Sequence, residues 1–282
     1  MTTDPPVVAP SDDVLARLFP VRKPLVGTVH LAPLPGSPRY EGEPMSSIIS
    51  RAVSDAQRYV KGGIDGLIVE NEGDIPFLKP ELVGAETVAA MSVVTHAVVQ
   101  AVDVPVGVLC LANANVQSLA IAKATGARFI RANQWANAYI ANEGYVEGNA
   151  AVALRFRASI LARDVAVFAD VHVKHGSHAI VADRDVRQLT HDTEAFGADV
   201  LIATGQRTGD PTQVSEVHEI ASVASRPVLV GSGLNKANAV DLLNVADGAI
   251  VGSAMKEDGV WWRSVSVERT RAIVEAVQRL RS

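Results

Sequence analysis

Residues 165–178 read VAVFADVHVKHGSH and bring together three side chains that could transfer protons. Alternate residues of an extended strand share a face, so Asp170, His172 and Lys174 are expected on the same side. A carboxylate, an imidazole and an amine can serve as base, acid and electrostatic stabiliser, and each is costly to bury without a partner. The pattern favours a functional cluster, with a structural ion pair between Asp170 and Lys174 or Arg131 as the alternative. Lys174 could instead contact a phosphate or, with a lowered pKa, form a Schiff base.

Two earlier apolar runs end in further acid–base groups. Residues 24–30 end in His30, and residues 64–70 end in Glu70, which begins the acidic sequence ENEGD. The predicted catalytic residues are therefore Asp170, Glu70, His30, His172 and Lys174. The imidazole and carboxylate groups of this set could also bind a divalent metal, with the candidate ligands His30, Glu70, Asp170 and His172. No spacing matches a dedicated zinc motif, so the cofactor stays unknown, with a divalent metal as one option.

Glycine-rich turns in the last third of the chain indicate a phosphate site. Residues 229–239 read LVGSGLNKANA, and residues 249–259 read AIVGSAMKEDG. Glycines after two neighbouring strands let backbone N–H groups approach a phosphate, as in the last two loops of many (β/α)8 barrels. Ordinary tight turns are the alternative. The predicted phosphate-binding residues are Gly231, Ser232, Gly233, Gly252 and Ser253.

Two more segments are expected to contact the rest of an anionic or sugar-bearing ligand. The sequence ATGQRTGDP, residues 203–211, offers hydroxyl groups, glycines and an arginine, and the candidates from it are Thr204 and Gly205. The sequence FIRANQWAN, residues 129–137, places Arg131 and Asn133 on one strand face.

The elements that must position these residues form a repeat. Eight short runs rich in Val and Ile alternate with segments of helical spacing. The runs cover residues 24–30, 64–70, 105–110, 128–132, 165–171, 199–203, 227–231 and 248–251. Such alternation predicts an α/β fold of the (β/α)8 TIM-barrel class, with an open Rossmann-like sheet as the alternative.

The two ends of the chain are interpreted as additions to this barrel. Residues 1–22 are predicted to be an N-terminal extension, and residues 23–282 a single barrel domain. Residues 261–280 are expected to form a long amphipathic closing helix. Trp261 and Trp262 at its start are either core residues or the seed of a subunit interface, because aromatic residues are enriched at interfaces; a homo-oligomer is expected.

Composition excludes several classes of protein. Of 282 residues 48% are hydrophobic, which excludes a disordered chain, and a formal net charge of −5 argues against a general nucleic-acid surface. A single cysteine, Cys110, allows no intrachain disulfide, so a reducing cytoplasm is predicted. The uncharged stretch 104–122 contains proline, glycine and amide residues, so no integral membrane segment is expected.

Several sequence blocks resemble the BtpA family over nearly the whole chain after residue 22. They are VGTVHLAPLPGSPRY, GLIVENEGDIPF, HVKHGSH, ATGQRTGDP and VLVGSGLN. The resemblance implies a TIM barrel and, from cyanobacterial members, a link to photosystem I biogenesis. The glycine-rich end is also similar to the ribulose-phosphate-binding barrels, whose members isomerise, epimerise or cleave phosphorylated sugars.

Three functional hypotheses follow. The first is a cytoplasmic enzyme of isomerase or lyase type that transfers a proton within a phosphorylated sugar or nucleoside-like metabolite. In it Asp170 or Glu70 is the base, His30 or His172 the acid, and Lys174 stabilises negative charge. The second is a non-catalytic photosystem I biogenesis or assembly factor, and the third a metal-dependent hydrolase.

Overall fold

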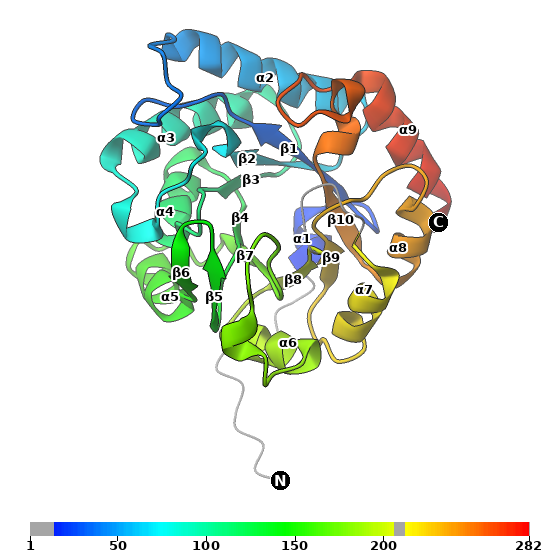
Figure 1. The fold of residues 1–282 in the computed structure, drawn as a ribbon. Helices are drawn as coiled ribbons and strands as arrows, with labels where there is room; N and C mark the ends of the chain where they lie inside the picture. The colour runs from blue at the N-terminus through cyan, green and yellow to red at the C-terminus, as the bar shows by residue number, and fades with distance from the viewer. Residues whose placement is uncertain (1–13, 206–211, 282) are drawn as a thin grey trace.

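A closed barrel of eight parallel strands forms the centre of the molecule (Figure 1). The computed structural model describes residues 14–205 and 212–281. Going round the barrel, the strands are β1 (Leu25–His30), β2 (Gly66–Glu70), β3 (Val106–Leu109), β4 (Phe129–Ala132), β7 (Ala166–Asp170), β8 (Val200–Ala203), β9 (Val228–Val230) and β10 (Gly248–Val251), which pairs with β1. All eight fall within the predicted runs. The TIM-barrel prediction is confirmed, and the open sheet is excluded.

Helices surround the ring of strands because parallel strands are buried on both faces and need cover. They are α2 (Met45–Lys61), α3 (Ala85–Ala101), α4 (Asn115–Thr125), α5 (Ala150–Ser159), α6 (Val186–Ala195), α7 (Val214–Ala221), α8 (Ala239–Val245) and α9 (Val267–Val277). Short 3₁₀ turns are η1 (Glu72–Asp74), η2 (Pro80–Leu82), η3 (Ala179–Val181), η4 (Ser253–Met255), η5 (Glu257–Gly259) and η6 (Gln278–Leu280). The larger hydrophobic core lies between strands and helices. Within the described ranges, no helix is long and apolar enough to cross a membrane.

The amino-terminal end of the barrel is filled by apolar side chains. Helix α1 (Val14–Leu18) and the following Phe19 belong to the same buried cluster as the inward-facing strand residues. The ring of Phe19 meets that of Phe129 edge-on at 6.2 Å, and Phe129 stacks on Phe168 at 4.5 Å. Part of the predicted extension therefore packs against the inward-facing strand residues at this end of the barrel.

A small antiparallel hairpin follows β4 and was not predicted. It consists of β5 (Ala138–Ala141) and β6 (Gly144–Glu147), and Ile140 forms a further bridge to Ser177 in the loop after β7. The hairpin therefore ties the β4 loop to the β7 loop at the carboxyl ends of the strands.

Two predicted boundaries are wrong. Strand β7 ends at Asp170, so the alternation that placed His172 and Lys174 on its face stops before either residue. The closing helix begins at Val267 and not at residue 261, because the Ser266 hydroxyl caps it by accepting the N–H of Arg269 at 3.2 Å.

Candidate functional site

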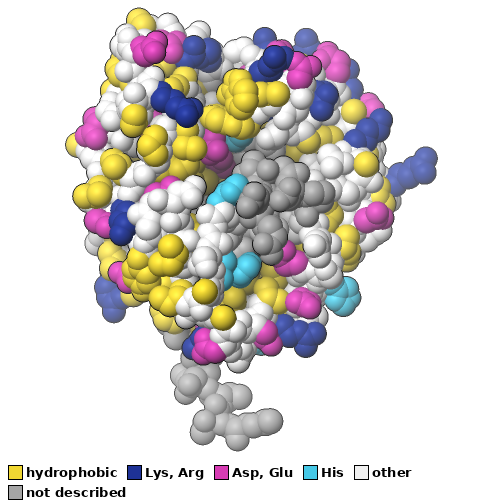
Figure 2. Space-filling model, viewed as in Figure 1, with side chains coloured by type: hydrophobic (Ala, Val, Ile, Leu, Met, Phe, Trp, Pro, Cys, Tyr) yellow, Lys and Arg dark blue, Asp and Glu magenta, His cyan; other side chains and the backbone are white. Residues whose placement is uncertain are grey.

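A cavity of about 670 Å³ opens at the carboxyl ends of the strands. On this face, histidine and acidic side chains gather near the centre of the molecule (Figure 2). Most of the predicted site residues line the cavity, namely His30, Glu70, Arg131, Asn133, Lys174, Gly231, Ser232, Gly233, Gly252 and Ser253. These residues come from different strands, which meet only when the barrel closes. The structure therefore brings these predicted site residues together at one cavity.

Arg131 is the buried cation at the centre of this arrangement. Its Nε and Nη2 donate to the two carboxylate oxygens of Asp170 at 3.0 and 3.1 Å, and Asn133 donates to the same carboxylate at 3.2 Å. Burial alone would lower the pKa of Arg131, but the Asp170 and Glu70 charges outweigh it and raise that pKa. Asp170 is only 3% exposed and does not line the cavity. It therefore holds Arg131 from behind.

The two carboxylate oxygens of Glu70 differ in their contacts. Its Oε2 lies 3.5 Å from Nε2 of His30, and its Oε1 lies 3.9 Å from Nη1 of Arg131. Oε1 has no hydrogen-bond partner among the described residues. Burial would raise the pKa of Glu70, but the hydrogen bond and charge of His30, with Arg131 and Lys174, lower it. Glu70 is therefore an ionised carboxylate at neutral pH with one oxygen able to accept a proton.

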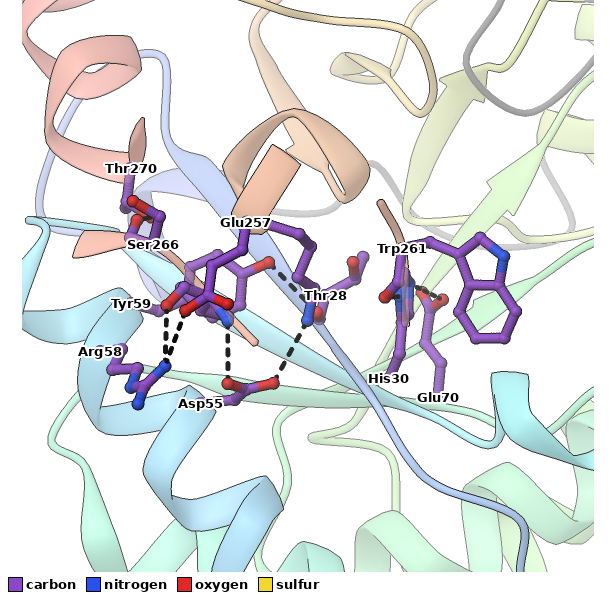
Figure 3. Close-up of polar contacts among 12 residues, drawn as sticks. Thr28, His30, Asp55, Arg58, Tyr59, Glu70, Glu257, Trp261, Ser266 and Thr270 are labelled. Atoms are coloured by element: carbon purple, nitrogen blue, oxygen red, sulfur yellow. Dashed lines mark hydrogen bonds and ion pairs between the residues drawn. The ribbon is translucent and has the colours of Figure 1, made fainter. Parts of the chain in front are cut away.

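His30 is oriented from both sides of its ring (Figure 3). Its Nδ1 lies 3.0 Å from the carbonyl oxygen of Trp261, and its Nε2 faces Glu70. A carbonyl oxygen can only accept, so Nδ1 carries a proton. The next proton of the pair then lies between Nε2 and the Glu70 carboxylate, which makes His30 and Glu70 one proton-sharing unit.

Lys174 connects this centre to the first glycine turn. Its Nζ donates to the Ser232 hydroxyl at 3.3 Å, and the Thr212 hydroxyl donates to the Ser232 carbonyl at 2.8 Å. Burial and the nearby Arg131 charge lower the pKa of Lys174, against the carboxylates, which raise it. A Cβ at Gly231 would overlap the side chain of Ile202, so the turn can approach the barrel centre only with glycine there.

The second glycine turn borders the same cavity from β10. A Cβ at Gly252 would lie 3.0 Å from Oγ1 of Thr28 and 3.5 Å from Cε1 of His30. Arg269 on α9 also lines the cavity and donates to the Ala254 carbonyl at 3.1 Å. Two glycine turns and two cations, Lys174 and Arg269, therefore share one wall.

Besides Asp170, three predicted site residues lie outside the cavity wall. The His172 ring packs on His178, with centroids 3.8 Å apart, and burial together with His178 lowers the pKa of His172 to about 4. The Thr204 hydroxyl donates to the His172 carbonyl at 2.9 Å, and Gly205 follows it. None of the three is among the cavity-lining residues. The remainder of that predicted ligand segment, residues 206–211, lies outside the described residues.

Several cavity residues were not predicted as site residues: Thr28, Glu72, Tyr139, Trp261 and Arg269. Thr28 could have been found, because it is two residues before His30 on the same strand face. Glu72 stands in the acidic sequence after β2, and burial raises its pKa. Trp261 lines the cavity, whereas Trp262 is 70% exposed, so the predicted aromatic pair is divided between the site and the surface. No local pattern marks Tyr139 or Arg269.

The predicted metal ligands do not form one donor set. Among the residues that the structure describes, no group of three or more His, Cys, Asp and Glu side chains could hold a metal ion. Asp170 gives both oxygens to Arg131, and His172 packs on His178. The geometry at Glu70 is that of a carboxylate between an imidazole and a guanidinium.

Comparison with known proteins adds relatives along almost the whole chain. The model of the BtpA family matches residues 21–279. A Pyrococcus horikoshii protein is 40% identical over 259 residues, 92% of this chain and 97% of its own. The photosystem I biogenesis protein BtpA of Synechocystis is 37% identical over 265 residues, 93% of this chain and 91% of its own. A Caenorhabditis elegans protein labelled mitochondrial is 35% identical over 274 residues, 95% of this chain and 98% of its own.

Solved structures share the fold at much lower identity. Phosphoribosyl anthranilate isomerase from Thermus thermophilus superimposes with a TM-score of 0.57 at 14% identity, covering 92% of this chain and 100% of that one. Tryptophan synthase from Mycobacterium tuberculosis gives 0.59 at 16% identity, covering 91% and 93%. These likenesses are evidence for the barrel alone.

Proposed function

This chain belongs to the BtpA family, and we propose that it is an enzyme that transfers a proton within a small phosphorylated metabolite. The reaction class is that of an isomerase or lyase. One observation carries the proposal: Glu70 lines the cavity as a buried, ionised carboxylate, and its Oε1 has no hydrogen-bond partner among the described residues. Such an oxygen suits a general base, because burial keeps water from competing for it.

The roles follow from the contacts. Glu70 accepts the substrate's proton on Oε1, and His30 donates to another atom of the substrate the proton that its Nε2 already shares with Oε2 of Glu70. Lys174 and Arg131 stabilise the negative charge that develops when a carbon acid loses its proton. Asp170, which the sequence offered as an equal candidate for the base, is assigned to holding Arg131, since both its oxygens are occupied.

The ligand class follows from the two sides of the cavity. The side built from the β9 and β10 turns carries glycines, Ser232 and the cations Lys174 and Arg269, which suits a phosphate. The loops after β2, β3 and β4 add apolar and aromatic side chains to the lining, namely Phe77, Leu111 and Tyr139. A phosphorylated sugar or nucleoside-like metabolite would place its charged and its less polar ends accordingly.

The cellular setting is proposed from the sequence and from one exposed side chain. We place the protein in the cytoplasm, as a homo-oligomer without a nucleic-acid partner. The single cysteine supports the cytoplasm, the exposed Trp262 supports the homo-oligomer, and the net charge of −5 supports the absence of a nucleic-acid partner.

Thermal unfolding against a ligand panel tests the proposal. The panel contains inorganic phosphate, sugar phosphates, nucleotides and the unphosphorylated parent compounds. A ligand at about 100 times its Kd stabilises the folded state by about 2.7 kcal/mol, a rise of several degrees in Tm. We expect the rise only with phosphorylated ligands, and its loss in Ser232→Glu, which puts a negative charge into the first glycine turn. Ser46→Glu, at an exposed position on α2, is the matched control and should keep the full rise.

The other two hypotheses are distinguished in the same experiment. The Synechocystis relative is named a photosystem I biogenesis protein, so a protein that binds no phosphorylated ligand and co-purifies stoichiometrically with a membrane complex would be an assembly factor. A Tm that rises with zinc or manganese alone would favour the metal-dependent hydrolase. Either result would overturn the proposed enzyme.

A further inference from the structure

The loop that follows β10 carries the carbonyl group that orients His30. Residues 252–266 connect β10 to α9 and are called the β10–α9 loop below. Its base is closed by an antiparallel bridge between Lys256 and Val265. Between these two residues the chain passes through Trp261, whose carbonyl oxygen lies 3.0 Å from Nδ1 of His30. The position of the base therefore determines where that carbonyl oxygen lies.

Helix α2 holds this base from outside the barrel through Asp55. The carboxylate accepts the backbone N–H of Val265 at 2.9 Å and lies 3.5 Å from Nζ of Lys256 (Figure 3 shows the Asp55 contacts). The Lys256 side chain is 1% exposed. Burial lowers the pKa of Lys256, and the Asp55 charge opposes that effect. A buried ammonium is tolerated only with such a partner, so Asp55 fixes both strands of the loop base.

The same cluster is also attached to the strand that carries His30. Nζ of Lys256 lies 5.4 Å from the ring centroid of the fully buried Tyr59. The Tyr59 hydroxyl donates to the Thr28 carbonyl at 3.2 Å, two residues before His30 in β1. A Cβ at Gly27 would lie 2.8 Å from the Tyr59 ring, so this close packing requires glycine there. The donor and the acceptor of the His30 hydrogen bond are thus both held by α2.

We propose that Asp55 is a positioning residue for the His30–Glu70 pair. By holding the base of the β10–α9 loop, Asp55 keeps the Trp261 carbonyl against Nδ1 of His30. The proton then stays on Nδ1, and Nε2 is left for Glu70. The inference rests on the proposed function for the use of this proton, but the orientation itself can be measured without a substrate.

Nitrogen NMR of the histidine side chains in the full-length ¹⁵N-labelled protein tests the proposal. The His30 signals are assigned by their absence in His30→Gln. The double variant Asp55→Ala with Lys256→Met removes the anchor without leaving either buried charge alone. We expect Nδ1 of His30 to be protonated in the wild type and to lose its proton in the double variant, because Nε2–H then serves the Glu70 carboxylate. Lys256→Met alone keeps the Asp55–Val265 hydrogen bond and should retain most of the Nδ1–H signal.

Arg58→Met is the matched control. Arg58 is on the same helix and donates to the Val265 carbonyl at 3.3 Å, but its side chain is 42% exposed. Exposed contacts of this kind contribute little, so its Nδ1–H signal should match the wild type. An unchanged His30 signal in the folded double variant, or an equal loss in Arg58→Met, would overturn the proposal. Failure of both Lys256→Met and the double variant to fold would also overturn it, because the cluster would then be a requirement of the fold.

The outcome is separable from that of the ligand panel. If phosphorylated ligands fail to bind but the Nδ1 proton is lost in the double variant, the proposed function is wrong and the positioning role stands. If ligands bind and the His30 signal does not change, the positioning role is wrong. With a substrate in hand, the double variant should lower kcat while KM stays near the wild-type value.

Discussion

Glu70 at the end of β2 and Asp170 at the end of β7 are two buried carboxylates that face the same guanidinium, that of Arg131 on β4. Asp170 receives two direct hydrogen bonds from Arg131 and a third from Asn133. Oε1 of Glu70 lies 3.9 Å from Nη1 of Arg131 and has no hydrogen-bond partner among the described residues. The residue types and burial are alike, and only the number of contacts differs.

This difference in contacts shows how two residues of the same chemical type can have different roles in one barrel. A carboxylate whose oxygens are all occupied fixes its partner but cannot take a proton without breaking that arrangement. A carboxylate with an open oxygen beside an imidazole can take a proton and share it. Under the proposed function, the Asp170 side is therefore the rigid side of the mouth, and the Glu70 side is the reactive one.

Replacing Glu70 and Asp170 in turn by their amides should give the largest difference in turnover and in stability. Once the ligand panel has identified a substrate, Glu70→Gln should lower turnover by about 100- to 10,000-fold, since the general base is lost. The free energy of unfolding should fall by less than about 1.5 kcal/mol. Asp170→Asn should instead lower the free energy of unfolding by about 1.5–3 kcal/mol, because it weakens the bonds to Arg131. Steady-state kinetics and urea unfolding measure both; a greater loss of turnover in a folded Asp170→Asn would make Asp170 the base.

Removing the shared cation should destabilise both sides at once. Arg131→Met leaves two buried carboxylates facing each other without a counter-charge, so the free energy of unfolding should fall by about 3–5 kcal/mol. Urea unfolding at pH 7 measures the loss. Arg157→Met, which breaks a more exposed pair with Asp199, is the control and should cost less. Equal losses in the two variants would show that Arg131 is not the central support.

Substitutions in the two glycine turns compare how tightly the two sides of the mouth are packed. Gly231→Ala places a methyl group against Ile202 and near Arg131, on the rigid side, and should cost about 1–3 kcal/mol by overpacking. Gly252→Ala meets the Thr28 hydroxyl and His30 on the reactive side, where the nearest atom would be 3.0 Å away, and should cost less. Thermal unfolding gives the ranking. The reverse ranking would mean that the reactive side is the more tightly packed of the two.

The contribution of His172 to stability can be tested by its pH dependence. The expected effect is the smallest of the four predictions. The folded protein lowers the pKa of His172 from 6.5 to about 4, so its stabilising contribution is complete above pH 6.5. Stability is then lost as the pH falls toward 4, because the unfolded chain binds the proton first. Allowing for partial solvent exposure, the loss is roughly 1–2 kcal/mol. Urea unfolding between pH 7 and 4 should show a shallower slope in His172→Gln, and equal slopes would contradict the assignment.

The fold was predictable because its signals are local. Each buried parallel strand needs a continuous apolar run, and each helix a stretch with apolar residues spaced three and four apart, so the eight repeats could be recognised in the sequence alone. The β5–β6 hairpin was missed because its strands are short and partly exposed, with Ile140 and Tyr145 at the surface. The end of β7 was misplaced because alternation in the sequence continues after the strand hydrogen bonds stop.

Only those residues of the candidate site that lie at or just after the end of a strand could be predicted from the sequence. His30, Glu70 and the glycine turns were found because barrels gather such positions at one end. The roles of Asp170 and His172 could not be assigned, because the residue type does not reveal the partner. An aspartate or histidine can contact a ligand, an arginine or another ring. Trp261 and Arg269 lie beyond the last strand, in segments without a repeat.

The sequence by itself therefore determined the barrel, the ring of polar strand ends and the place of the glycine turns, because periodicity and burial are properties of consecutive residues. Only the tertiary structure decided which carboxylate is saturated and which is open, and that His30 is oriented by Trp261 and α2. Those contacts join residues separated by 37 to 231 positions in the chain. Hydrogen bonding and charge pairing act through space, so they become defined only when the barrel closes.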